Sequence, residues 1–263
     1  MSPATNKLRI ITLATVFNLF FEYAVGGINR MFERPLTLIV LFFIYFCFFT
    51  MLEDLIRRFR LSNLQIFVCA WVFGIFPELY LTGSIFTEPL ILGINWVSFL
   101  TINIVWWGCL QSLVTLYFAN RIVPRQWDEP YLHWSGWALC ITYIGILCIG
   151  SILNSPTLRR GPLEGYIVAT AFQLGGLAYL VFSIRRQDRP TYAFKANTIL
   201  DCLAFGTIAT FFIIGTLVAG THATLQEGNM LDSNALLYAS IWNYVVFGGV
   251  IVYYARERKP ITA

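Results

Sequence analysis

The chain has 263 residues, of which 57% are hydrophobic and only 12% are charged, and its mean hydropathy is +0.67. Soluble proteins carry roughly a quarter of their residues as charged side chains, so this composition excludes a soluble globular protein and indicates an integral membrane protein. The net charge of +4 does not indicate nucleic acid binding, because the arginines lie in short clusters at the ends of apolar runs, where membrane topology explains them.

The cysteines and histidines indicate neither a disulfide framework nor a metal centre. All six cysteines lie within apolar runs and none forms a Cys-x-x-Cys pair, as expected for buried thiols that act as small hydrophobic side chains. The two histidines, His133 and His222, are too few and too far apart for haem or a histidine-rich site. We therefore predict no metal ion, and the sequence identifies no cofactor.

Long apolar runs predict the architecture. A transmembrane helix needs about 20 predominantly apolar residues to cross a hydrocarbon core of about 30 Å. By this criterion we predict an all-α polytopic membrane protein, a single helical domain over residues 1–263 with eight transmembrane helices. In chain order these are 8–28, 35–56, 64–81, 89–118, 131–153, 163–184, 196–220 and 234–254. We expect the first to be a retained span rather than a cleaved signal peptide.

The distribution of basic residues predicts the topology. Lys and Arg accumulate on the cytoplasmic side of membrane proteins. With both termini in the cytoplasm, only Arg30, Arg34, Arg159 and Arg160 of the 18 Lys and Arg residues lie outside. We therefore predict cytoplasmic N- and C-termini. Short loops and the absence of sorting tails favour the plasma (inner) membrane of a bacterium or an archaeon.

The fourth apolar run is longer than a membrane requires. Residues 89–120 would form a helix of about 48 Å at 1.5 Å per residue, so we expect it to tilt strongly or to project into the cytoplasm. Trp127, Trp134 and Trp137 follow it, as an aromatic belt at the inner boundary of the fifth span would.

The eight spans show a recurring helix-end pattern. Pro-Leu opens three of the even-numbered spans, and proline costs no hydrogen bond at the first helical position. Glycines stand near the ends of the odd spans, where glycine can terminate a helix. These glycines are Gly27, Gly83, Gly150 and Gly220. The residues five positions before them are, in the same order, Glu22, Glu78, Gly145 and Gly215. Four related helical hairpins would explain the pattern, and so would convergent helix-end chemistry.

The acidic residues at two of these positions indicate a functional site. Glu22 and Glu78 are carboxylates inside apolar runs, where a charge costs about 2.5 kcal/mol or more on insertion scales. If the hairpins pack as repeats, the two side chains approach each other, and one must then stay protonated or the pair must hold a cation. The alternative is that each reaches headgroup water or pairs with an arginine of the adjoining loop, Arg30 or Arg34.

Amide side chains form a second set of mid-span polar residues. Their commonest use in membranes is an interhelical hydrogen bond, whereas a polar pathway requires several of them to face inward together. The set comprises Asn18, Asn95, Asn103, Gln111, Gln173 and Asn243. We place Glu22, Glu78, Asn18 and Arg30 in the candidate ligand-binding or ion-binding site.

The remaining charged residues have structural interpretations. Glu53 and Asp54 precede Arg57 and Arg58 at i, i+4 spacing, which predicts a salt-bridged helix end. Asp201, about one turn into the seventh span, has Lys195 six residues and Asn197 four residues before it. It is more consistent with an interfacial ion pair or water contact than with a relay.

The sequence supports three classes of function. The first is a small transporter or permease with an outward-facing acidic site for a cation, a proton or a small solute. The second is an intramembrane enzyme acting on a lipid or isoprenoid, which would fit an aromatic-lined pocket for an apolar ligand. No familiar catalytic motif is present, so no catalytic residue is assigned. The third is a non-catalytic membrane subunit that docks a protein partner. All three are embedded in a lipid bilayer.

Overall fold

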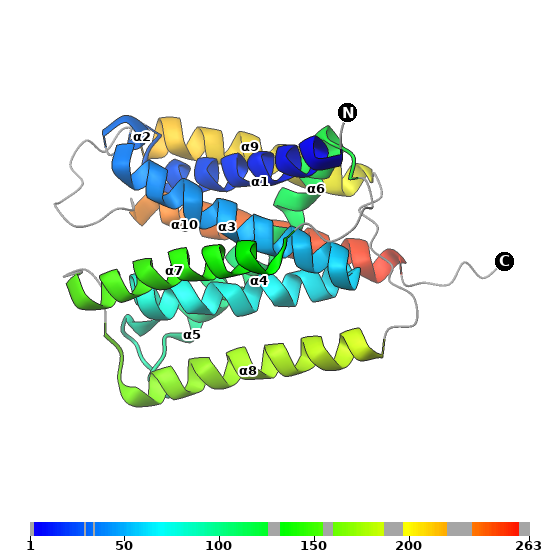
Figure 1. The fold of residues 1–263 in the computed structure, drawn as a ribbon. Coiled ribbons are helices and arrows are strands. Elements are labelled where there is room, and N and C mark those ends of the chain that lie inside the picture. Colours follow the sequence, from blue (N-terminus) through cyan, green and yellow to red (C-terminus); the bar gives the residue numbers. More distant parts are fainter. Residues whose placement is uncertain are drawn as a thin grey trace.

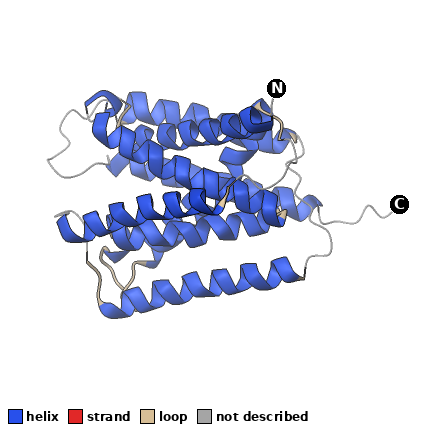
Figure 2. Cartoon of the chain, viewed as in Figure 1, coloured by secondary structure: helices blue, strands red, loops and turns tan. Residues whose placement is uncertain are grey.

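Eight apolar helices run alongside one another in the computed structural model (Figure 1), which describes residues 3–28, 30–33, 35–125, 132–154, 160–186, 197–219 and 233–257. Each is long and apolar enough to cross a membrane. Within these residues the regular structure is entirely helical, as Figure 2 shows, so the prediction of an all-α protein with eight membrane-spanning helices is confirmed.

The first four spans and their connections contain most of the residues discussed below. The bounds are α1 (Pro3–Gly26), α2 (Arg30–Glu33), α3 (Pro35–Phe59), α4 (Asn63–Pro77), η1 (Glu78–Thr82), η2 (Ser84–Phe86), α5 (Trp96–Phe99), η3 (Leu100–Val114) and α6 (Thr115–Ile122). Here η1 and η3 are π-helical, with amides bonded to carbonyls five residues back, and η2 is a 3₁₀ turn. The second half comprises α7 (Trp134–Asn154), α8 (Leu163–Arg185), α9 (Thr198–Ile213), η4 (Ile214–Val218) and α10 (Ser233–Glu257).

Local sequence explains where several helices start. Ser62 and Gln65 form a capping box at α4, each side chain bonding the backbone amide of the other. Asn95 and Asn197 cap α5 and α9 through their side-chain oxygens. Such caps satisfy amides that have no partner within the helix, so they set the first residue of the span.

The fourth span starts at Trp96, so the prediction of a helix from residue 89 is wrong. The span covers Trp96–Ile122, 27 residues, and the segment before it folds into η2 and a short bridge between Ile91 and Ile94. Asn95 explains the difference. Its side-chain amide donates to the Thr87 carbonyl at 3.0 Å, and its oxygen caps the Ser98 amide at 3.0 Å, so the helix begins only after it.

Glycine terminates two of the helices for which it was predicted to do so. Gly27 and Gly83 have φ values of 93° and 65°, in the left-handed region that favours glycine. Gly150 does not, because α7 continues through it to Asn154, and that prediction is wrong. Gly220 lies outside the described residues. Whether the four hairpins are related stays a prediction.

Burial separates a central group of helices from a peripheral one. More than half of the most apolar window is buried in the first, third and fourth spans, but only 17% in α7 and in α8. In Figure 1, α8 lies at the edge of the bundle, and it packs mainly against α4. α4 in turn makes its most extensive contact with η3. The candidate site lies where these central helices meet α3, which packs against α1.

Candidate functional site

Glu22 and Glu78 both lie near one end of the bundle, the predicted outer end. Glu22 lies on α1 about one turn before its end, and Glu78 is the first residue of η1. Their charges are near enough to interact. Glu78 is 6% exposed and Glu22 is half-buried. No arginine or lysine forms an ion pair with either carboxylate within the described part of the chain.

Tyr45 and Gln111 complete the surroundings of Glu22. The Tyr45 hydroxyl on α3 donates to Glu22 Oε2 at 3.0 Å, and Gln111 Nε2 on η3 donates to the Tyr45 hydroxyl at 3.0 Å. Both Tyr45 and Gln111 are buried, with 3% and 0% of their surface exposed. The three residues come from three helices, so the hydrogen-bond chain holds α1, α3 and η3 in register at the site.

Asn18 extends this chain along α1. Its Nδ2 donates to the Gln111 backbone carbonyl at 3.3 Å, an interhelical bond of the kind predicted for the mid-span amides. Asn18 Oδ1 and Gln111 Oε1 are buried and accept no hydrogen bond, and the same holds for Thr15 Oγ1. Thr15, Asn18 and Glu22 are three and four residues apart and therefore share one face of α1. Because buried polar atoms are normally bonded, these oxygens require a donor or a cation.

Glu78 has a different environment, made of short hydroxyl side chains. Thr82 Oγ1 donates to Glu78 Oε2 at 2.7 Å, and Ser84 Oγ also donates to this oxygen. The left-handed Gly83 reverses the chain after η1 and returns Ser84 to the carboxylate. Pro77, which has no amide proton, precedes Glu78 at the change from α-helix to π-helix.

Trp107 lies between the two acidic residues. Its ring centroid is 5.9 Å from that of Tyr45, and its indole is near enough to Glu78 to act on that carboxylate. It also packs against Phe48 and Phe73, at centroid distances of 5.4 and 5.5 Å. Neither Tyr45 nor Trp107 was predicted from the sequence. The one local signal was the i, i+4 spacing of Asn103, Trp107 and Gln111, which places large polar or amphipathic side chains on one helix face.

Arg30, the fourth predicted site residue, begins α2, and its side chain lies outside the described residues, as does Arg34. The described ranges contain no group of three or more His, Cys, Asp or Glu side chains that could hold a metal ion. The chemistry available here is therefore that of carboxylates, amides and hydroxyls.

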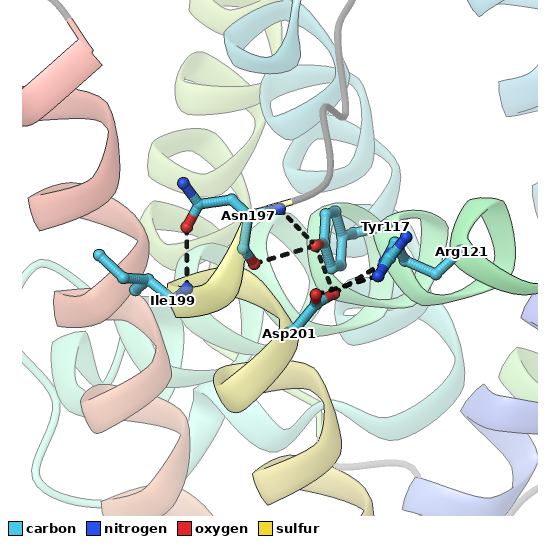
Figure 3. Close-up of polar contacts among 5 residues, drawn as sticks. All are labelled: Tyr117, Arg121, Asn197, Ile199 and Asp201. Carbon is cyan, nitrogen blue, oxygen red and sulfur yellow. Dashed lines mark hydrogen bonds and ion pairs between the residues drawn. The ribbon is translucent and has the colours of Figure 1, made fainter.

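A second polar cluster joins two helices at the opposite end of the bundle (Figure 3). Asp201 on α9 forms an ion pair with Arg121 on α6, with Nε–Oδ1 and Nη2–Oδ2 distances of 2.8 and 3.1 Å. The Tyr117 hydroxyl donates to Asp201 Oδ1 at 2.6 Å and accepts a hydrogen bond from the backbone amide of Asn197 at 3.2 Å. The predicted ion pair of Asp201 is confirmed, and its partner is a residue 80 positions away. Lys195 lies outside the described residues.

A third cluster at this same end is more deeply buried. The i, i+4 pairs Glu53–Arg57 and Asp54–Arg58 are present at 3.5 and 3.1 Å, which confirms the predicted salt-bridged helix end. Arg125 also pairs with Glu53.

Two tryptophans begin α7 near this cluster. Trp134 is 81% exposed, as expected for a residue at a membrane boundary. Trp137 instead donates its indole proton to Asp54 at 2.9 Å, so its position is set by a hydrogen bond as well as by the predicted belt. Trp127 lies outside the described residues.

Comparison with known proteins identifies the family of the chain. A family model described as "Uncharacterized membrane protein family" matches residues 11–259. No curated protein and no solved structure matches. Since the match extends over all eight spans, from the first helix to the last, the chain belongs to this family of membrane proteins.

Proposed function

We propose that the protein is a small transporter or permease in which Glu22 and Glu78 form an acidic site that takes up a proton or a small cation from the outer face. One observation carries the proposal. Two interacting carboxylates lie inside a membrane-spanning bundle, and neither has a basic partner in the described part of the chain.

The energetics favour a functional role. An unpaired charge costs about 2.5–3.5 kcal/mol at the centre of a membrane helix on insertion scales, and less toward the end of the span, where Glu22 lies. Two carboxylates near each other repel in addition. Uptake of a proton or a cation relieves both effects, so occupancy of the site changes the free energy of this end of the bundle. Coupling such a change to a shift between two conformations is how a transporter uses an ion.

The arrangement of helices supports the same function. Glu22 is on α1, its hydrogen-bond partner Tyr45 is on α3, and Glu78 follows α4. Neutralising the acids changes the interactions among three separate spans. The connections between helices are short, which leaves no room for a separate catalytic domain.

A flux assay with a charge-neutralising variant tests the proposal. Protein is reconstituted into liposomes that contain a pH-sensitive dye, and an inward proton or Na⁺ gradient is imposed together with a potassium diffusion potential. We expect the wild-type protein to pass ions and Glu78→Gln to reduce the flux by about tenfold or more, because glutamine keeps the shape but cannot ionise.

Glu164→Gln is the matched control, because Glu164 is an exposed carboxylate at the start of α8. It should keep the wild-type flux. The proposal is wrong if the wild-type protein behaves like empty vesicles under both gradients, or if Glu78→Gln transports as well as the control.

We further propose that both termini are cytoplasmic and that the protein resides in the plasma membrane of a bacterium or archaeon. We expect a green fluorescent protein fused at either terminus to fluoresce, and alkaline phosphatase fused after residue 157 to be active. The reason is that residues 155–159 form a predicted outer loop, and alkaline phosphatase folds only outside the cytoplasm. Active phosphatase at the C-terminus would contradict the topology.

A further inference from the structure

We propose that Glu22, Asn18 and Gln111 bind a monovalent metal cation of the Na⁺ type. The inference rests on the proposed function and deepens it, because it states which of the two carboxylates binds the ion and with which ligands.

The direction of the hydrogen bonds leaves buried amide oxygens without a donor. A tyrosine hydroxyl has one proton, and Tyr45 gives it to Glu22 Oε2. The proton between Gln111 and Tyr45 must therefore come from Gln111 Nε2, which fixes the orientation of the Gln111 amide. Its Oε1 has no donor. Gln111 Oε1 on η3 is thus a hydrogen-bond acceptor for which this network contains no donor.

Asn18 contributes in the same way. Its Nδ2 bonds the Gln111 backbone carbonyl, so its Oδ1 is the free end of the amide, and this oxygen is buried without a donor. Asn18 is one turn before Glu22 on the same face of α1 and is bonded directly to Gln111. Glu22, Asn18 and Gln111 are therefore joined by hydrogen bonds and by one face of α1, and Asn18 and Gln111 are both 0% exposed.

The charge of the cluster favours an ion over water. A water molecule can donate to the amide oxygens, but it does not neutralise Glu22, which has no basic partner among the residues that the structure describes. One carboxylate with two neutral amide oxygens carries a single negative charge, which matches a monovalent cation. Oxygen ligands of this kind suit hard cations, whereas soft metals prefer sulfur or imidazole.

Glu78 does not belong to this ligand set. Its Oε2 already accepts hydrogen bonds from the Thr82 and Ser84 hydroxyls. Its charge lies close enough to act on Glu22 and strengthens the attraction for a cation there without contacting the ion. The two glutamates thus have different roles although their sequence settings are similar.

Equilibrium binding to the purified protein tests the inference without any transport measurement. Saturable binding of radioactive Na⁺ is measured in detergent at fixed pH, with choline chloride to hold the ionic strength constant. The melting temperature is followed in parallel, because a ligand that binds only the folded state raises it. We expect saturable Na⁺ binding, a rise in Tm with Na⁺ but not with choline, and loss of both in Glu22→Gln.

Amide variants separate a ligand role from a packing role. Asn18→Leu is expected to weaken Na⁺ binding by about tenfold or more, the scale on which partners of a metal site act. Asn103→Leu is the matched control, because Asn103 is also a fully buried amide with an oxygen that has no donor, but it lies two helical turns from Gln111 and bonds within its own helix. It should bind Na⁺ with wild-type affinity.

Three outcomes would overturn the inference: no saturable Na⁺ binding to folded wild-type protein, equal weakening by Asn18→Leu and Asn103→Leu, or a response to methylammonium in place of Na⁺. A response to K⁺ as well as Na⁺ supports it. Na⁺ binding without ion flux would retain the cation site and reject the transporter. Flux that depends on Glu78, without Na⁺ binding, would retain the transporter and reject the cation site.

Discussion

Glu53→Gln is expected to lower the free energy of unfolding by about 3–5 kcal/mol, the range found when one partner of a buried ion pair is removed. The Glu53 side chain is 2% exposed, and it contacts Arg57, 1% exposed, and Arg125, 3% exposed. Glutamine keeps the shape of the side chain but removes the negative charge that both guanidinium groups share. The loss can be measured by SDS-induced unfolding in mixed micelles.

Asp201→Asn is the comparison that isolates burial as the cause. Its ion pair with Arg121 lies at the same end of the bundle, but the two side chains are 26% and 43% exposed, so water screens the interaction. We expect a clearly smaller loss than for Glu53→Gln. Equal losses in the two variants would mean that burial does not determine the strength of these ion pairs.

Gly74→Ala is expected to destabilise the protein by about 1–3 kcal/mol and to impair the acidic site as well. A Cβ atom at Gly74 on α4 would lie 2.4 Å from Trp107 Cγ and 2.7 Å from Trp107 Cβ. These atoms are close to the backbone of η3 and cannot rotate away, so either Trp107 or the whole helix must shift. Because Trp107 lies between Tyr45 and Glu78, a shift here should also reduce ion flux.

Two variants make this prediction specific. Gly145→Ala on α7 introduces the same methyl group where no atom lies within 4 Å, and it should leave both stability and flux unchanged. Gly74→Ala combined with Trp107→Leu should recover part of the stability, because the smaller side chain makes room for the methyl group. The double variant should not recover ion flux. If Gly74→Ala unfolds and transports like the wild-type protein, then the contact between α4 and η3 is not as close as described.

The two positions at which residue type alone misjudged a helix end have separate physical causes. Pro89 and Gly150 have residue types that begin and end helices, but neither position does so here. Before Trp96, the bonds of Asn95 to Thr87 and Ser98 stabilise a folded loop instead of a helix. At Gly150 the apolar run continues to Leu153, and a helix in lipid continues wherever stopping would leave backbone groups without hydrogen bonds.

The number of spans, and the presence of two carboxylates inside them, follow from the amino-acid sequence alone. Both follow from local properties, since the length of an apolar run and the cost of a charge within it do not depend on distant residues. The sequence also indicated the i, i+4 pairs at the end of α3, because one helix brings those residues together.

Only the tertiary structure decided which side chains meet. Glu22, Tyr45 and Gln111 are separated by 23 and 66 residues, and no local pattern encodes the order of helices in space. The same holds for Arg121 with Asp201 and for Arg125 with Glu53. The physical reason is that all eight spans are similarly apolar, so their neighbours are selected by close packing and buried polar contacts between helices, which exist only once the bundle has formed.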